Sequence, residues 1–287
     1  MTLNICYQAI GKVVDFVIWL VYNTDNYWSW LHAMSSLNHR LEEFYDDGVS
    51  FIMMHGIRKR KGRRKDNSKD SPTPPVPEEA RQYLEDSCVR ERVTDADFYK
   101  LVALPPSVDY NEWLATHSIS FFNHVNLMYG VISEYCTSES CPSMTGPGNV
   151  QFLWYDDKGK KYKNTAPQYV DYLTTYVQKQ ISDESLYPTK FGQPFPNSLE
   201  ATTKKCHRLL FHVLAHMYHA HYSDCVTLGI HGHLNSLFTH FMVFNIKFDL
   251  MEDKETEVLQ DLLEALVKQL PDPNQNDDKE TSEVTRS

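Results

Sequence analysis

The sequence lacks an uninterrupted apolar run of the length that crosses a membrane. A transmembrane helix needs about 20 apolar residues, but the strongest apolar stretch covers only residues 13–21, and Asp15 interrupts it. The basic start and small-residue cleavage site of a secretory signal are also missing. We therefore expect a soluble, intracellular protein with no stable membrane insertion.

Familiar catalytic motifs are absent as well. The sequence contains no H-E-x-x-H, no G-x-S-x-G and no glycine-rich phosphate loop. Glu134 lies close to Cys136 in the sequence and could be considered as a general base, but a carboxylate in such a place more often makes a surface contact. We expect a protein that is not an enzyme. The alternative is a metal-dependent hydrolase, which would need an exchangeable water on its metal.

Cysteine is scarce, with six residues in the chain, and only Cys136 and Cys141 are closely spaced. This usage favours a reducing compartment, in which the close pair serves a metal and not a disulfide.

Positive charge is concentrated in one place. The chain has a net charge of −10, and residues 58–65 (RKRKGRRK) form a dense basic run, so the remainder is more acidic still. An acidic body suits a basic partner and argues against nucleic-acid binding. The basic run resembles a nuclear-localisation signal, which predicts a cytoplasmic and nuclear protein. Its alternative role is that of a solvated linker.

The composition changes along the chain and predicts four segments. Residues 1–57 form a variable, aromatic-rich N-terminal extension. Residues 58–77 are a linker, basic and then rich in Pro and Ser, that cannot build a core. Residues 78–270 form the main domain, and residues 271–287 form a polar, disordered tail.

The main domain has a mostly helical pattern. Apolar residues recur at helical spacing in residues 121–132, 210–218, 234–241 and 259–270, and Pro271 ends the last stretch. The first of these belongs to a helix expected from about Asp109 to Tyr135. Residues 151–155 and 160–163 flank a turn and predict a β-hairpin. The fold class is therefore all-α with a small hairpin, and aromatic residues, 13% of the chain, should dominate its core.

The sequence also contains the ligands of a zinc site. Cys136 and Cys141 are followed much later by a histidine-rich stretch at residues 212–221, and two cysteines with two histidines complete a tetrahedral site that leaves no position for water. On an ideal helix His216 shares a face with His212 or His219, but His221 lies about 140° away from it. Spacing alone therefore favours the pair His212 and His216 in a structural zinc site.

Many short motifs between residues 80 and 270 resemble those of the Mob family of kinase coactivators. Residues 81–84, 92–95 and 155–159 look most like the second, Ndr-restricted class of animal Mob proteins. The motifs are Leu104-Pro105, Asn111–Trp113, Phe121–Asn123, Tyr129-Gly130, Glu134–Cys136, Cys141-Pro142, Ala166–Asp171, Pro188–Lys190, Pro194–Pro196, Ala215–His219, His233–Asn235 and His240-Phe241.

The resemblance implies a Mob fold, which is a four-helix-bundle core with extra helices and a structural Zn²⁺. The family's ligands match Cys136, Cys141, His216 and His221, and this set differs from the one that spacing favours.

The resemblance also implies a function. Family members are not enzymes; they bind the basic N-terminal regulatory helices of Ndr and Lats kinases and promote or restrain kinase activity. An acidic face steers and orients such a segment. The implied kinase contacts are the acidic residues Asp109 and Glu112 and the bundle-face residues His124, Leu127, Met128 and His240. The alternative roles are helix-dipole stabilisation for the acidic pair and packing for the others. We expect a coactivator or a competitive modulator.

Two departures from the family pattern affect the partner. Lats-binding members carry an aspartate where this chain has Ser120, so binding to a Lats-type kinase is not expected. Phosphopeptide-binding members carry a basic triplet, which matches Arg208, Leu209 and His212 here. Arg208 alone keeps a permanent charge, so a bidentate grip on phosphate is not expected. A phosphopeptide-binding adaptor in a Hippo-like cascade is therefore the alternative to the leading hypothesis.

Overall fold

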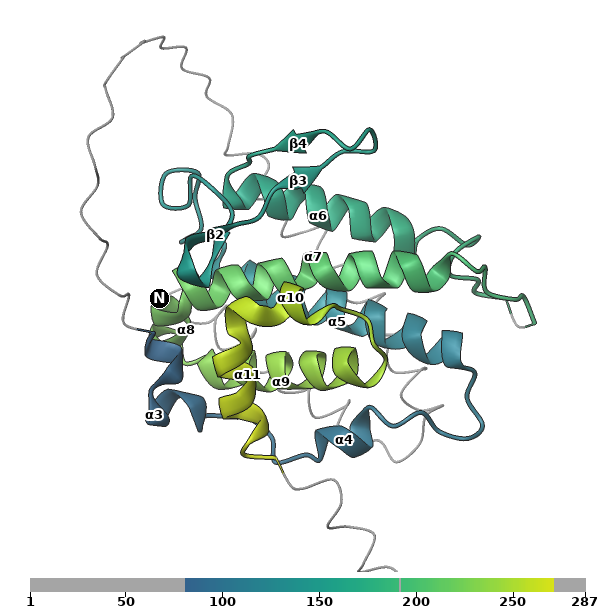
Figure 1. Cartoon of the computed structure of the whole chain (residues 1–287), viewed down its shortest axis with the longest axis horizontal. Helices are drawn as coiled ribbons and strands as arrows, with labels where there is room; N and C mark the ends of the chain where they lie inside the picture. Colours follow the sequence, from purple (N-terminus) through teal and green to yellow (C-terminus); the bar gives the residue numbers. More distant parts are fainter. Residues whose placement is uncertain (1–80, 191, 271–287) are drawn as a thin grey trace, which may run out of the picture. The chain divides into compact units, whose positions relative to one another are not determined.

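Four long helices contain most of the α-helical residues of the described structure (Figure 1). The computed structural model describes residues 81–190 and 192–270, which belong to one compact unit. The predicted segments at residues 1–57, 58–77 and 271–287 lie outside the described residues. The long helices are α5 (Tyr110–Ile132), α6 (Ala166–Ile181), α7 (Leu199–Ala220) and α9 (His231–Lys247).

Shorter elements complete the described part of the chain. The short α-helices are α3 (Asp86–Val89), α4 (Phe98–Leu101), α8 (Tyr222–Thr227), α10 (Asp253–Thr256) and α11 (Gln260–Val267). The 3-10 helices are η1 (Gln82–Leu84), η2 (Pro147–Asn149) and η3 (Glu257–Leu259).

Helix α7 lies at the centre of the core. It packs against α5 and α6, while α5 also contacts α9, and α4 and α11 pack on α9. Of the largest fully buried side chains, most are aromatic, which confirms the predicted aromatic core of a mostly helical fold. Those side chains are Tyr169, Tyr218, Phe98, Phe121, Phe211, Phe238, Phe241, Phe244, Leu114, Ile132, Met144 and Leu173.

Local signals in the sequence explain where the long helices begin. The Asp109 carboxylate accepts hydrogen bonds from the backbone N–H groups of Asn111 (2.8 Å) and Glu112 (3.2 Å), so Asp109 caps α5. Thr165 caps α6 in the same way. Helix α5 ends at Ile132, short of the predicted end near Tyr135.

The described strands form two antiparallel ribbons of two strands each. Strand β1 (Thr145–Gly146) pairs with β2 (Val150–Gln151), and β3 (Trp154–Tyr155) pairs with β4 (Lys161–Tyr162). The predicted hairpin around residues 156–159 is therefore confirmed. However, Gln151 was predicted in its first strand, and it instead lies opposite Thr145 in the other ribbon.

Edge-to-face and tilted aromatic contacts hold the hairpin on the bundle. The Trp154 ring packs against Tyr169, Tyr172 and Tyr176 of α6, with centroid distances of 5.6, 5.7 and 6.4 Å. These three tyrosines recur at helical spacing, so they present one face of α6 to the hairpin.

Within the described residues, no helix combines the length and the apolar character that a membrane span requires. The apolar stretch at residues 13–21 lies outside them.

Candidate metal centre

A tight loop after α5 brings the two cysteines together. The backbone N–H of Cys136 donates to Ile132 O (3.2 Å), and that of Cys141 donates to Thr137 O (2.8 Å). Inside the loop, the Ser140 hydroxyl donates to Tyr135 O (2.7 Å). These bonds fold the intervening residues back on themselves, so both thiols point to the same side.

The two histidines come from the end of α7. His216 lies within the helix, but the helix ends at Ala220, and His221 has a non-helical backbone with φ −130° and ψ 13°. If the helix continued, the His221 side chain would point about 140° away from that of His216. Because the backbone of His221 is not helical, its side chain takes a different direction. The two imidazole centroids lie 5.2 Å apart.

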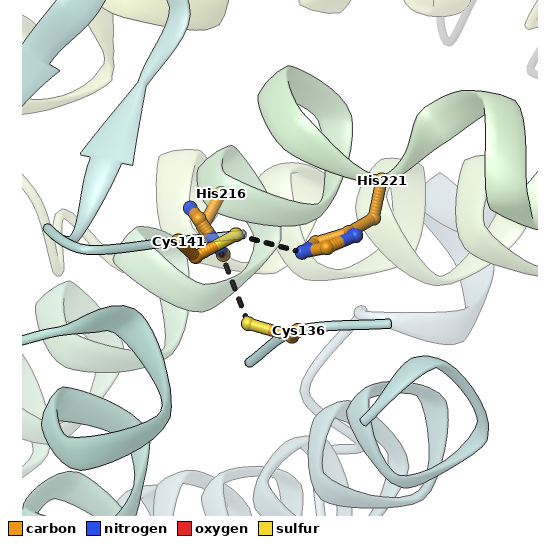
Figure 2. A group of neighbouring side chains, drawn as sticks. All are labelled: Cys136, Cys141, His216 and His221. Atoms are coloured by element: carbon orange, nitrogen blue, oxygen red, sulfur yellow. Dashed lines mark hydrogen bonds between the residues drawn. The ribbon is translucent and has the colours of Figure 1, made fainter. Parts of the chain in front are cut away.

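The four side chains converge on one point (Figure 2). Cys136 Sγ lies 3.5 Å from His216 Nε2, and Cys141 Sγ lies 3.4 Å from His221 Nε2. All four ligand atoms lie within 4.8 Å of one another, and all four residues are buried. For tetrahedral zinc with Zn–S of about 2.3 Å and Zn–N of about 2.05 Å, the expected S···N separation is about 3.6 Å. The donor set and its spacing therefore fit Zn²⁺.

Hydrogen bonds outside the centre orient both imidazole rings. His216 Nδ1 lies 2.8 Å from Thr145 O in β1, and His221 Nδ1 lies 3.0 Å from Asp224 Oδ2 in α8. Because each Nδ1–H donates outward, each Nε2 keeps a lone pair for the metal.

Burial favours the uncharged forms of Cys136 and His216. It raises the pKa of the Cys136 thiol to about 12, although the Tyr129 hydroxyl bonded to it acts in the opposite direction. Burial also lowers the pKa of His216 to about 4, against the effect of its bond to Thr145. A divalent cation must therefore displace thiol protons when it binds. Two thiolates would balance its charge, and four protein ligands would fill its coordination shell, so the centre suits a structural role and not catalysis.

The preference for His212 as a ligand, which rested on spacing, is wrong. The ring of His212 stacks on Phe152 with centroids 4.0 Å apart, and its Nδ1 lies 2.7 Å from the Tyr169 hydroxyl. Burial lowers the pKa of His212 to about 3. His212 thus belongs to the contact between α6 and α7. The ligand set implied by the family resemblance is the one that the structure brings together.

The residues predicted to contact a kinase differ in exposure. Asp109 and Glu112 at the start of α5 are exposed, and His124 and Leu127 further along the helix are half-buried. Met128 and His240 are buried, with 3% and 8% of their surface accessible.

The side chain of Arg208, the predicted phosphate contact, is already paired with a carboxylate of this chain. Its guanidinium forms an ion pair with Glu255 of α10, whose side chain is only 16% exposed.

Sequence reasoning missed the partners Thr145 and Asp224. Thr145 acts through its backbone carbonyl, so no side-chain signal marks it. Asp224 follows His221 by three residues, and this H-x-x-D spacing was the available signal.

The described fold and centre together define a class: helical-bundle domains built around a buried Cys₂His₂ metal centre. A family model described as the Mob1/phocein family matches residues 90–259. The chain belongs to this family.

Curated relatives agree with this assignment. MOB kinase activator 2 of Mus musculus is 48% identical over 202 residues, which cover 70% of this chain and 86% of the relative. MOB kinase activator-like 2 of Drosophila melanogaster is 48% identical over 207 residues (72% of this chain, 36% of the relative). The protein of the same name in Drosophila pseudoobscura pseudoobscura is 45% identical over 244 residues (84% and 42%). The chain thus spans about two fifths of the length of the two fly relatives.

Proposed function

We propose that this protein is a non-catalytic regulator of Ndr-family Ser/Thr kinases that binds their basic N-terminal regulatory region. Membership of the Mob1/phocein family and relatives named MOB kinase activators support a kinase-regulating role. The observation that carries the binding mode is an exposed acidic surface at the start of α5, formed by Asp109 and Glu112.

Further carboxylates extend this acidic surface. Burial raises the pKa of Tyr110, and the nearby carboxylates of Glu200 and Asp249 raise it further, with Lys204 opposing them. Lys204 is itself paired with Glu200 at 3.1 Å. The surface around Tyr110 therefore carries more negative than positive charge, which favours a basic segment.

Exposed apolar groups lie beside these acids. Tyr110 is 37% exposed and packs on Phe248, the residue that follows α9, at a centroid distance of 5.9 Å. Ile246, near the end of α9, is 62% exposed. An amphipathic helix with a basic face needs such apolar anchors in addition to charge, because buried apolar contacts supply most of the affinity at protein interfaces.

The other predicted kinase contacts fall into two groups according to their burial. We propose that Leu127 and His124 contact the kinase directly, since both are half-buried on α5. Met128 and His240 are buried, and we assign them a supporting role beneath the contact surface. His240 packs edge-on against Phe121 at 4.9 Å, which fixes α9 against α5.

Regulation without catalysis follows from binding alone. A protein that binds one arrangement of the kinase more tightly than another shifts the kinase toward that arrangement. The same surface can also displace an activating relative, so the protein acts as a coactivator or as a competitive modulator.

Ser120 supports a preference for Ndr-type over Lats-type kinases. Lats-binding family members carry an aspartate at this position. Here the side chain is buried, with 5% of its surface accessible, and its Oγ lies 3.3 Å from His124 Nδ1. It thus offers no negative charge to a partner.

No observation favours the phosphopeptide-adaptor hypothesis. Glu255 already neutralises Arg208, and burial keeps the His212 ring uncharged. A phosphate would have to displace Glu255 and would then meet a single permanent cation.

The basic run at residues 58–65 supports a distribution between the cytoplasm and the nucleus. Replacing its arginines and lysines with glutamine in the full chain should deplete the protein from the nucleus, as measured by imaging. An unchanged distribution would contradict this proposal.

The central experiment measures the affinity of the full chain for the N-terminal segment of an Ndr-type kinase. The double variant Asp109→Asn/Glu112→Gln removes two charges and keeps an N-cap residue at position 109. It should bind more weakly and with a smaller salt dependence. A control variant, Asp157→Asn/Glu257→Gln, removes two exposed charges from other elements.

Equal affinities for the double variant and the wild type would refute the acidic-surface proposal. Tighter binding of a Lats-type segment than of an Ndr-type segment would refute the proposed specificity.

A further inference from the structure

The direction of the His221 side chain is not set by the regular geometry of a helix, because its backbone is non-helical. The residue ends α7 and precedes α8. Its backbone is held on both sides, because its N–H donates to Met217 O and its carbonyl accepts from Cys225 N–H, each at 3.0 Å. These bonds position the Cα atom, but the rotation of the imidazole ring needs a side-chain partner.

Asp224 is that partner. Its Oδ2 lies 3.0 Å from His221 Nδ1, on the side of the ring opposite Nε2, which faces Cys141 Sγ at 3.4 Å. A carboxylate only accepts hydrogen bonds, so the proton of the ring stays on Nδ1. Nε2 then faces Cys141 Sγ (Figure 2) and keeps its lone pair for a metal.

The two histidine ligands differ in the character of their partners. His216 donates to a neutral backbone carbonyl, that of Thr145. His221 donates to a carboxylate, and its ring is only 3% exposed, whereas the Asp224 side chain is 29% exposed. A charged acceptor increases the electron donation of an imidazole to a metal more than a neutral acceptor does.

We infer that Asp224 is a positioning residue of the metal centre, which holds the His221 ring in the Nδ1-protonated form and slows the loss of the metal. Among the described residues, the hydrogen-bond acceptor of His216 Nδ1 is the backbone carbonyl of Thr145, which a substitution of a side chain does not remove. Asp224 is therefore the partner of the two histidine ligands that mutation can test.

A purely structural role for Asp224 makes different predictions. The residue lies in the first turn of α8, where a negative charge favours the helix dipole. Loss of that effect would weaken the short helix, but it would not change the rate at which a folded centre releases its metal.

The test uses the full chain loaded with zinc and the variants Asp224→Ala and Asp224→Asn. Transfer of zinc to an excess of a chromophoric chelator gives the release rate, and competition with the chelator gives the affinity. Asp224→Ala should lower the affinity by roughly 10- to 100-fold. Asp224→Asn should have a smaller effect, because its amide oxygen still accepts a hydrogen bond but carries no charge.

Glu200→Ala is the matched control. Glu200 also lies in the first turn of a helix, α7, but at the end of that helix opposite His216 and His221. This variant should release zinc at the wild-type rate.

Nitrogen-15 NMR of the His221 ring provides a readout of orientation. In the zinc-loaded protein the metal on Nε2 leaves the ring proton on Nδ1. This proton should exchange slowly with water in the wild type, because Asp224 accepts its hydrogen bond, and faster in Asp224→Ala. The inference is overturned if Asp224→Ala releases zinc at the wild-type rate, if Glu200→Ala shows an equal acceleration, or if the Nδ1 proton exchanges equally slowly in Asp224→Ala.

Discussion

Acid should destabilise this fold through a histidine that has no part in the metal centre. His207 of α7 is fully buried. Its Nδ1 lies 2.9 Å from Asn245 Oδ1, its Nε2 lies 3.0 Å from Ser118 Oγ, and its ring stacks on Phe241 with centroids 5.3 Å apart. Burial lowers the pKa of His207 from 6.5 to about 4, although its bond to Asn245 acts in the opposite direction.

The sign and the size of the effect follow from this depressed pKa. In the unfolded chain the imidazole takes up a proton as the pH falls below about 6.5, whereas in the folded protein it stays neutral until about pH 4. The stability that the neutral ring contributes is thus complete above pH 6.5 and is lost progressively between pH 6.5 and 4. A shift of this size corresponds to about 3 kcal/mol in total, of which about 2 kcal/mol is lost by pH 5.

The assay is denaturant unfolding of zinc-loaded protein at pH 7.5 and pH 5.0, for the wild type and for His207→Gln. Glutamine can bond to both partners of His207 but does not titrate. The free energy of unfolding of the wild type should fall between the two pH values by about 2 kcal/mol more than that of the variant. Effects of acid on the metal centre are common to both proteins and cancel in this difference.

Leu210→Ala is the control, because it removes a buried side chain from the same helix without removing a titrating group. Its loss of stability should be the same at both pH values. If wild type and His207→Gln lose equal free energy between pH 7.5 and 5.0, the reasoning about burial of His207 is refuted.

Three further predictions concern the metal, the cap of α5 and the core. Chelation of the metal, or Cys136→Ala, should abolish the cooperative unfolding transition in circular dichroism. Structural zinc contributes on the order of 10 kcal/mol, whereas the free energy of unfolding of most domains is only about 5–15 kcal/mol. The control Cys206→Ala, at a buried cysteine outside the centre, should keep the transition. Asp109→Ala should lower the free energy of unfolding by about 1 kcal/mol and Asp109→Ser by far less, since serine also caps helices; equal losses in chemical denaturation would exclude the capping role. Phe238→Ala should cost about 3–5 kcal/mol, because this ring is fully buried in α9, and a loss below 1 kcal/mol in the same assay would contradict the described packing.

Much of the helical core could be predicted from the sequence. The apolar residues at 210–218 and 234–241 recur with the period of a helix, and they lie in the buried parts of α7 and α9. This succeeds because one face of each helix must leave water, and the period of the helix places that face in the sequence. The start of α5 is also a local property, since Asp109 caps the helix with its own side chain.

The burial of individual residues could not be predicted as well from the sequence. Met128 is buried and Leu127 is half-buried, although they are neighbours in the implied kinase contact. Their difference depends on which other helices cover α5, and helical spacing within α5 does not contain that information.

The sequence by itself determined the types of ligand and the two segments that supply them, because two cysteines and two histidines are a typical ligand set of structural zinc and the close pair and the histidine-rich stretch supply both types. The choice among the histidines was decided by tertiary structure. Tyr169, from another helix, binds the His212 ring, and the end of α7 turns His221 toward the cysteines. Both events depend on contacts between segments far apart in the chain, whereas helical spacing describes only neighbours on a single helix.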